Sequence, residues 1–587
     1  MRIRSTPRRS IALLASLGLL ATTAMSPAVA AGDPQKAASP SPRFSSAAAF
    51  DVSPALRDLA TSTARRAAPS APDAEPIEIR PDRGPVAQDQ GYSGDGALQG
   101  AASRLAAPAT AATFQAPLAN FEGISNEDNF NIFGFRVNPP DPVGDVGPNH
   151  YVEMVNLAFA VYDKSGNLLL GPVDTGTLWA GFAVEDCTDP SGDPIVLYDQ
   201  TTDRWLLSQF TTRGPKYYDC VAISTSGDPT GAYYRYAFVT QPDPELPGGT
   251  FFPDYPKYGV WTDSYLMTTR DFGDVTGYGI SVYALEKNKM IAGNPKARAV
   301  QFFLDGNDPA ILPLVGDGLL PPDIDGNRRP VNGIAAPIIG TQDDGGGYGA
   351  TFDAANIFEL KVQWNSKPTA SLVLAAQLPV ASFDSIFPCA PTSRDCLPQP
   401  GITNPAQYLD ILSYRQRPTH RLAYRNFGKY ESLVTNQSVE AALGAAGVRW
   451  YEIRRTASVY SVYQQGTYAP SDGVHRWMGS AAMDKKGNMA VGYSVVNGVD
   501  VYPGIRYTGR LAGDALGQMT LGEGVIINGS GVQRTTNSRW GDYTSLNVDP
   551  VDDCTFWYVN EYYTLAGQLS STAGWQTRIA SFKLPGC

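Results

Sequence analysis

The sequence contains a degenerate repeat, and this repeat limits the folds that the chain can adopt. Each copy has a polar start, an apolar strand-like run, a turn with an acidic residue, and a second apolar run. Neighbouring clear copies lie roughly 50 to 65 residues apart, a spacing that suits one four-stranded propeller blade with its loops. The clear copies begin at Gly192, Pro253, Arg476 and Arg539, and residues 141–147 form a further copy.

We therefore predict an all-β protein, a β-propeller of about seven blades, with six or eight blades as alternatives. Repetition around an axis hides the edges of small sheets. Strand-like runs such as 151–155 and 205–210 and turn sequences at 163–167 and 484–488 are typical of meandering hairpins. The competing fold is an array of β-sandwiches, which does not require an acidic turn at this spacing.

Residues 1–30 predict a signal peptide. Arginines at positions 2, 4, 8 and 9 precede a short apolar stretch, and Ala28, Val29 and Ala30 give the small-x-small pattern of a cleavage site. The alternative is an N-terminal membrane anchor. No later segment approaches 18 uninterrupted apolar residues, so we expect a secreted, extracellular protein without a membrane span.

Residues 31–120 are rich in Ala, Pro and Ser and poor in larger apolar residues. Such a stretch buries too little surface to offset its ordering entropy, which predicts a disordered linker or pro-region with one short helix near 55–66. A cleaved pro-peptide and a tether to the cell wall are the two uses we consider. The propeller domain is then predicted to span residues 121–587.

Six cysteines in an exported chain are expected to form disulfides. We predict pairing between nearest neighbours: Cys187 with Cys220, Cys389 with Cys396, and Cys554 with Cys587. A metal site is the alternative, but the sequence has no Cys-x-x-Cys and no His near any cysteine.

The net charge of −11 argues against a nucleic-acid partner, because a phosphate-binding surface needs an excess of Lys and Arg. No basic run exists outside the predicted signal peptide. We expect a monomer whose partner is an extracellular polysaccharide or another glycan.

Two of the repeated units resemble those of a known group of proteins. One is Asp-Pro-x-Val-x-Tyr-Asp…Arg-Trp at 193–205, and the other is Arg-Trp-Gly-Asp-Tyr…Val-Asp-Pro…Phe-Trp at 539–557. They resemble units of largely uncharacterised secreted bacterial β-propeller proteins that are labelled sialidase-like or BNR-like. The resemblance covers 121–587 and implies the fold and export. The sialidase motif Ser-x-Asp-x-Gly-x-x-Trp is absent, so the resemblance does not imply sialidase activity.

Asp193, Asp254 and Asp542 recur at strand starts, where an Asp can accept backbone N–H bonds from the following turn. The same strand starts are expected to face the central channel, where converging carboxylates can serve as general acid, base or nucleophile. We therefore interpret these three residues as candidate catalytic residues. Two titratable residues near strand starts that do not repeat, Glu431 and His475, complete the set.

Residues 419–428 are dense in groups that recognise anions or sugars. Several arginines directed at one channel would hold a carboxylated sugar by forked hydrogen bonds. The alternative is that each Arg stacks on Trp and caps a strand end. The predicted substrate-binding residues are His420, Arg421, Tyr424, Arg425, Arg476 and Arg539.

No cofactor is firmly indicated. Asp323, Asp325 and Asn327 resemble the opening of a calcium loop, and 141–145 do so more weakly, but neither is followed by the Glu that completes an EF-hand. Structural calcium is thus an alternative. Catalytic zinc is disfavoured, because His150, His420 and His475 are dispersed and no His-Glu-x-x-His occurs.

Export, a propeller fold and the Arg, His and acidic set together lead us to expect a secreted carbohydrate-active propeller. Its activity would be that of a glycoside hydrolase or a polysaccharide lyase acting on an extracellular polysaccharide. The alternatives are a non-catalytic propeller that binds glycan or protein at the cell surface, and a structural secreted protein without a small ligand.

Overall fold

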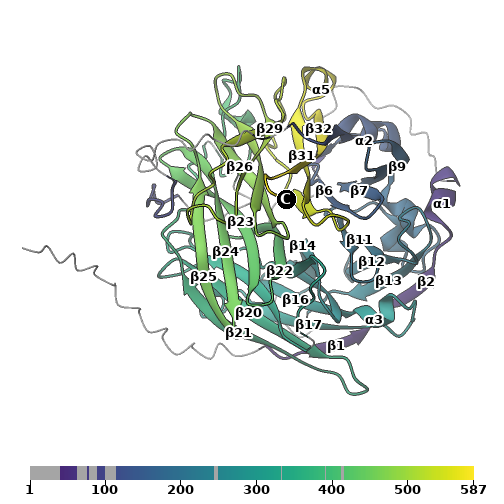
Figure 1. Cartoon of the computed structure of the whole chain (residues 1–587). Helices are drawn as coiled ribbons and strands as arrows, with labels where there is room; N and C mark the ends of the chain where they lie inside the picture. The colour runs from purple at the N-terminus through teal and green to yellow at the C-terminus, as the bar shows by residue number, and fades with distance from the viewer. Residues whose placement is uncertain are drawn as a thin grey trace, which may run out of the picture.

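The computed structural model describes residues 40–62, 76–78, 89–99, 114, 116–242, 249–331, 333–390, 392–411 and 416–587. The predicted signal peptide lies outside these residues. The described chain forms seven β-sheet blades in a ring around one axis (Figure 1). The predicted seven-bladed propeller is therefore confirmed.

The blades follow one another along the chain, and neighbouring strands within a blade are antiparallel. Blade 1 consists of β6 (Val143–Val146), β7 (His150–Val155), β8 (Ala158–Asp163) and β9 (Leu168–Asp174). Blade 2 consists of β10 (Ile195–Asp199), β11 (Arg204–Phe210), β12 (Tyr218–Ser224) and β13 (Tyr233–Val239). Blade 3 consists of β14 (Phe251–Val260), β15 (Ser264–Gly273), β16 (Tyr278–Glu286) and β17 (Arg298–Asp305).

Blade 4 departs from this pattern. Its sheet has β19 (Ala336–Gln342), β20 (Ala354–Gln363) and β21 (Thr369–Pro379), while β18 (Pro322–Asp325) pairs in parallel with the first strand of blade 5. Blades 5 and 6 are β22 (Thr419–Asn426), β23 (Glu431–Ala442), β24 (Ala445–Thr456) and β25 (Val459–Tyr468); and β26 (His475–Met483), β27 (Met489–Val496), β28 (Gly504–Arg510) and β29 (Glu523–Ile527).

The ring is closed by strands from both ends of the propeller sequence. Blade 7 takes β30 (Ser545–Val548), β31 (Thr555–Tyr563) and β32 (Trp575–Lys583) from the C-terminal end, and β4 (Ala119–Ser125) forms its outer edge. Because neither end can leave without opening this sheet, the shared blade fastens the ring.

The remaining described elements are short and lie between or beside the blades. They are α1 (Leu56–Ser62), α2 (Asn126–Phe133), α3 (Lys287–Met290), α4 (Leu312–Val315) and α5 (Leu565–Ser570), the 3-10 turns η2 (Thr175–Trp179), η3 (Glu185–Thr188) and η4 (Pro405–Gln407), and the parallel pair β3 (Ile77–Glu78) and β5 (Val137–Asn138).

Apolar side chains fill the spaces between blades. Trp205, Trp477 and Trp540 are fully buried, and the rings of Trp477 and Trp540 lie 5.2 Å apart where blades 6 and 7 meet. The acidic turns of the repeat hold the hairpins. Asp484 accepts backbone N–H bonds from Lys486 and Asn488, so this recurring aspartate is architectural, as an Asx turn requires.

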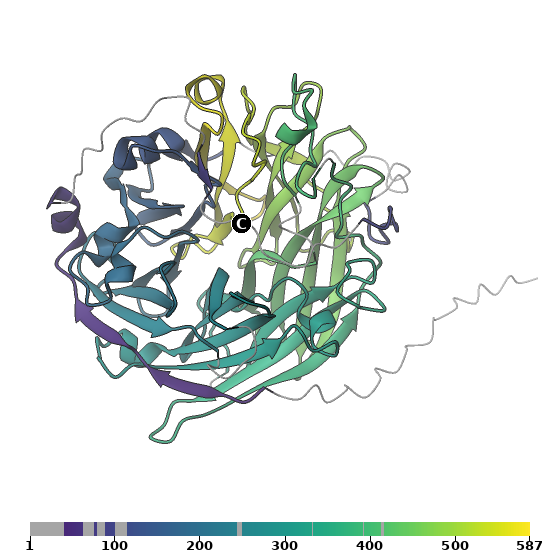
Figure 2. The ribbon, with the colours of Figure 1, turned by 180° about the vertical axis from the view of Figure 1, so that it is seen from behind.

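Part of the segment predicted to be a linker is built into the propeller. Strand β1 (Arg43–Ser46) pairs with β17, and β2 (Ala49–Val52) pairs with β13. Figure 2 shows these purple strands along the outer rim of the ring. The prediction of disorder is wrong for these residues, because backbone hydrogen bonds to an exposed sheet edge need no long apolar run. The predicted helix near 55–66 is α1.

A second piece of this segment is held by a buried ion pair. Asp95 lies 2.9 Å from the Arg449 guanidinium of blade 5, and both side chains are buried. The Thr467 hydroxyl donates to the other Asp95 oxygen at 2.6 Å. Residues 89–99 therefore supply the counter-charge for a blade arginine.

The three disulfides are the predicted ones: Cys187–Cys220, Cys389–Cys396 and Cys554–Cys587. Such cross-links are expected in an oxidising compartment. None of the described helices has the length and apolar character needed to cross a membrane.

One buried carboxyl gives a pH-dependent prediction. Burial raises the pKa of Glu153 to about 8, far above its value in an unfolded chain. The native state therefore holds a proton that the unfolded state has released, and Glu153 costs stability increasingly as pH rises from about 4.5 to 8. The free energy of unfolding of Glu153→Gln, relative to that of the wild type, is expected to rise by about 1.4 kcal/mol per pH unit between pH 5 and 8.

Urea unfolding of both proteins at several pH values checks this slope. Glu185→Gln is the matched control, because the Glu185 side chain is 85% exposed, and its curve should run parallel to that of the wild type. A Glu153→Gln curve that is also parallel would mean that the native carboxyl is already ionised.

Candidate functional site

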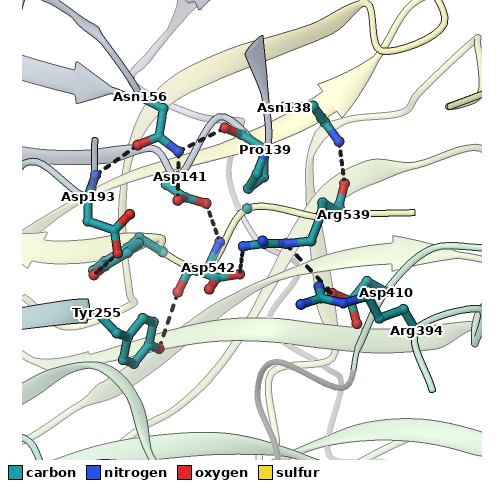
Figure 3. A network of polar contacts seen from close by, with 12 residues as sticks. Asn138, Pro139, Asp141, Asn156, Asp193, Tyr255, Arg394, Asp410, Arg539 and Asp542 are labelled. Carbon is teal, nitrogen blue, oxygen red and sulfur yellow. Dashed lines mark hydrogen bonds and ion pairs between the residues drawn. The ribbon is translucent and has the colours of Figure 1, made fainter. Parts of the chain in front are cut away.

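The inner strands of the blades begin at one end of the ring, and the residues just before them meet near the axis. Asp141 precedes β6, Asp193 precedes β10, Arg417 precedes β22 and Asp542 precedes β30, while β14 contributes through a bulge between Asp254 and Lys257. We call this group the axial cluster: Asp141, Asp193, Asp254, Tyr255, Lys257, Arg417, Asp542 and Tyr543. Figure 3 shows part of it.

A shared backbone conformation brings three of these side chains to equivalent places. Asp141, Asp193 and Tyr255 have φ values of 49°, 43° and 54°, and each is followed by proline. A positive φ is unusual for such residues and marks a structurally fixed position. Tyr255 is therefore the blade 3 counterpart of Asp193, and Asp254 stands one residue earlier than the sequence repeat suggested.

An alternating chain of carboxylates and guanidinium groups runs through the cluster. In order, the nearest nitrogen–oxygen distances are Asp254–Arg270 3.8 Å, Arg270–Asp317 2.7 Å, Asp317–Arg417 3.3 Å, Arg417–Asp542 4.0 Å, Asp542–Arg539 3.3 Å, Arg539–Asp410 4.0 Å and Asp410–Arg394 2.6 Å. Each carboxylate in this series of ion pairs has an arginine beside it.

Three other carboxyl groups lie beside these ion pairs, and the pKa of each is raised. Burial raises the pKa of Asp193 far above its ordinary range, and the charges of Asp141 and Asp254 raise it further. Burial also raises the pKa of Asp141 to about 7 and that of Glu561 well above its usual value. The site therefore combines carboxyl groups whose pKa is raised by burial with carboxyl groups that are paired to arginine.

A stack of cations and aromatic rings lies beneath the carboxylates. The Lys257 ammonium lies 3.0 Å from the Tyr255 ring centre and 3.2 Å from that of Tyr543, and the Arg417 guanidinium lies 3.7 Å from the Tyr255 ring. Burial and the charge of Arg417 lower the pKa of Lys257 well below its usual range. The Arg417 guanidinium thus makes a cation–π contact with Tyr255, and the Lys257 amine packs between the Tyr255 and Tyr543 rings.

Hydrogen bonds join the cluster across blades. Asp141 accepts the Asp542 amide at 2.6 Å and the Asn156 side-chain amide at 2.7 Å, as Figure 3 shows. The Tyr543 hydroxyl lies 3.1 Å from Asp193 Oδ2, and the Tyr255 hydroxyl donates to the Asp542 carbonyl at 3.3 Å. The two candidate acids are thus held by rings that flank the same lysine.

Four of the residues proposed from sequence meet here. Asp193, Asp254 and Asp542 belong to the cluster, and Arg539 pairs with Asp542. The Asp193 side chain, which was also considered as a cap for its own turn, is bonded to the Tyr543 hydroxyl of another blade. His420 is buried beside the cluster, where burial and the charge of Lys257 lower its pKa well below the usual value.

Glu431, proposed as catalytic, does not belong to the site. It pairs with Asn426 at the far end of β22, about 23 Å from Thr419 at strand spacing. Both of its oxygens bind the Arg455 guanidinium, and one also receives the hydroxyl of Tyr424, a predicted substrate-binding residue. Both side chains are engaged in blade architecture.

His475, the other non-repeating catalytic candidate, is engaged in packing between blades 5 and 6. Its Nδ1 accepts the Ala446 amide at 3.3 Å, and its ring meets Phe387 edge-on. Burial lowers its pKa to about 4.

Three predicted substrate-binding arginines are bound to protein carboxylates elsewhere, and two of them lie on the inner strands of blades 5 and 6. Arg425 forms a fork on Asp553, with distances of 2.9 and 2.7 Å. Arg476 binds Asp472 and Glu523 at 2.7 and 2.8 Å. These guanidinium groups already direct their forked hydrogen bonds at protein carboxylates, so the same bonds cannot bind the carboxylate of a sugar acid.

Arg421, the third, also corrects the calcium interpretation. Its guanidinium lies 2.8 Å from Asp323 and 2.7 Å from Asp325, and all three side chains are buried. Asp145, from the weaker calcium-like stretch, accepts the Tyr198 amide. The oxygens that a calcium ion would bind therefore already have protein donors.

Another acidic group offers metal-like spacing. Asp343, Asp344 and Asp353 place carboxylate oxygens within 4.8 Å of one another. Asp343 accepts bonds from the Ser385 amide and hydroxyl, and Asp353 accepts the amides of Asp344 and Phe383. These bonds hold the loops together.

An insertion between blades 4 and 5 lies against the cluster. It contains the Cys389–Cys396 disulfide. Its Asp395 accepts a hydrogen bond at 2.6 Å from the hydroxyl of Ser538, which stands three residues before Gly541. Asp410 of the same insertion receives Arg394 at 2.6 Å and faces Arg539 (Figure 3). The insertion thereby supports the arginine that pairs with Asp542.

Sequence reasoning missed Asp141, Tyr255, Lys257, Arg417, Tyr543 and Glu561. A signal existed for the first two, because Asp141, Asp193 and Tyr255 each precede a proline at the start of an inner strand. Lys257 gave a weaker signal, because it is a single lysine in a strand rich in aromatic residues. Arg417 lies in a poorly repeated stretch and gave none.

No protein-family model matches the sequence, and no curated protein matches it. Solved structures with partial similarity include the endosialidase of phage phi92, with 6% identity over 67% of this chain and 66% of that one and a TM-score of 0.37. Another is the GH93 α-L-arabinofuranosidase of Fusarium graminearum with arabinobiose, with 10% identity over 66% of this chain and 91% of that one and a TM-score of 0.30. A third is the Penicillium chrysogenum α-L-arabinanase with arabinobiose, with 12% identity over 67% of this chain and 96% of that one and a TM-score of 0.27. At these scores the roles of residues rest on the geometry above, and the described chain is a seven-bladed β-propeller.

Proposed function

We propose that the protein is a secreted glycoside hydrolase that cleaves an extracellular polysaccharide at the axial cluster. One observation carries this proposal. Asp193 and Asp542 belong to one cluster but lie in different environments, since burial and the neighbouring carboxylates raise the pKa of Asp193 whereas Asp542 has two arginines beside it. Glycosidic cleavage requires two carboxyl groups, one that donates a proton and one that acts as base or nucleophile.

The roles follow from these environments. Asp193 donates its proton to the glycosidic oxygen as that bond to the anomeric carbon breaks. Asp542, as a carboxylate, either activates the attacking water or attacks the anomeric carbon itself. The positive charge that develops on the sugar ring is stabilised by the ionised carboxylates of the cluster.

Exposure favours the same assignment. The side chains of Asp254 and Asp542 are 19% and 11% exposed, whereas that of Arg417 is fully buried. A sugar would meet the carboxylates first, with the arginines behind them as counter-charges.

A second candidate is a glycan-binding propeller without catalysis. The observation that favours it is the number of structural bonds in the cluster, such as Asp141 with the Asp542 amide and with Asn156. In that case the carboxylates would close the ring and bind sugar hydroxyls without transferring protons.

The test is a screen of the purified protein against a panel of neutral and acidic polysaccharides. We expect the wild type to release new reducing ends and no unsaturated products. We expect Asp193→Asn to release no new reducing ends. Products that absorb as unsaturated uronates would identify a lyase instead. Saturable binding without cleavage, measured by calorimetry, would support the binding protein.

A further inference from the structure

The segment 43–62 lies along the rim of the propeller as a separate ligand would. We call residues 43–62 the rim strap. Its strand β1 adds to the outer edge of blade 3 and its strand β2 adds to that of blade 2, so each of these sheets gains a fifth strand (Figure 2). Edge pairing of this kind is how proteins bind extended peptides.

The junction between the two strands ties the blades together. The Ala47 amide donates to Ala297 of blade 3 at 3.0 Å, and the Ala48 amide donates to Ala237 of blade 2 at 2.8 Å. The rim strap therefore crosses from one blade to the next without a break in its backbone bonds.

A buried arginine of blade 2 depends on the rim strap for its counter-charge. Arg235 is 3% exposed at its side chain and forms a fork on Asp51 with distances of 2.7 and 2.6 Å. The other bonds of Arg235 go to the neutral carbonyls of Leu178 and Ala180. Withdrawal of the rim strap would leave a buried cation without a carboxylate, which is strongly unfavourable.

An apolar anchor follows the ion pair. Leu56 of α1 is fully buried in the cluster that contains Trp179 and Phe182, which lie in the connection between blades 1 and 2. The Leu56 amide donates to Gly231, and the Ser53 amide donates to Tyr233. The rim strap thus combines strand pairing, a buried ion pair and a buried leucine, as a peptide does in a specific groove.

We propose that the rim strap binds the propeller as a peptide ligand and stays bound after the chain is cut between residues 62 and 76. The surface is the outer edge of β13 and β17 with Arg235 beside it, and the partner is this extended segment of the same chain, which carries Asp51. Cleavage of this connection then yields a two-chain protein that keeps the rim strap.

The experiment uses the full chain with a specific protease site inserted after Arg66 and an affinity tag placed at residue 31. After complete cleavage, confirmed on a denaturing gel, the tagged segment is captured under native conditions. We expect nearly all of the propeller to elute with the tag and to separate from it only in denaturant. A propeller that leaves the column before elution, or that precipitates while the tagged segment stays alone, would overturn the proposal.

Matched variants give the ion pair its own readout. Asp51→Asn in the same cleavable chain is expected to speed dissociation of the rim strap at least ten-fold, because Arg235 loses its carboxylate. Asp58→Asn, an exposed carboxylate of α1, removes the same charge without touching Arg235 and should leave the rate unchanged. Equal rates for the two variants would show that the fork does not hold the rim strap.

Discussion

Replacing Asp542 with asparagine is expected to lower the kcat for glycan cleavage by about 10²- to 10⁴-fold with little change in KM, as removal of a positioned acid or base does. An asparagine at this position would keep the size of the side chain, but its amide cannot accept a proton or attack the sugar. Asp193→Asn should have an effect of the same order, because it removes the proton that the leaving group needs. Initial rates of reducing-end release measure both.

Glu431→Gln is the informative control for this pair. Glu431 was a catalytic candidate by sequence, yet it binds Arg455 and Tyr424 at the far end of β22. We expect its kcat to match that of the wild type while its melting temperature falls. If Glu431→Gln lost activity while folded and Asp542→Asn retained it, the axial cluster would be the wrong site.

Replacing Arg421 with alanine is expected to destabilise the fold by about 3–5 kcal/mol at pH 7, the cost of leaving buried carboxylates without their partner. Arg421 faces Asp323 and Asp325. Burial raises the pKa of the neighbouring Asp145 to about 7, and the charge of Arg421 opposes that rise. Urea unfolding at constant ionic strength measures the loss.

The effect of Arg421→Ala should depend on pH in one direction. Without the guanidinium, the native pKa values of Asp323 and Asp145, which burial already raises, rise further above their unfolded values. The folded state of the variant is therefore penalised increasingly as pH rises above about 4. The destabilisation should therefore be smaller at pH 5 than at pH 8. Arg421→Lys keeps the charge and should lose much less, whereas an equal loss at all pH values would contradict the ionic explanation.

The architecture could be predicted from the sequence because repetition, turn chemistry and cysteine spacing are local. Asp484 bonds to amides two and four residues away, and Cys389 pairs within seven residues. Such features can be recognised without knowing which blade faces which. The strand starts at Asp193 and Asp542 were visible for the same reason, since an aspartate recurs there in several copies.

The site was predicted less well because its contacts join blades that are distant in sequence. Asp141 meets the amide of Asp542, 401 residues away, and Arg417 meets Asp317 of another blade. An arginine in a strand, such as Arg425, gives no sign in the sequence that Asp553 will neutralise it. The predicted linker failed similarly, because strand pairing at an edge depends on the partner sheet and not on composition.

The closure of blade 7 has a consequence for the order in which the protein assembles. The amide of Ala119 on β4 meets Ser581 of β32, 462 residues later in the chain. During synthesis β4 must wait, unpaired, until nearly the whole chain has emerged. β2 needs only β13, and β1 needs only β17. The rim strap can therefore settle on blades 2 and 3 early, while closure of the ring is the last and slowest event, as contacts of long sequence separation generally are.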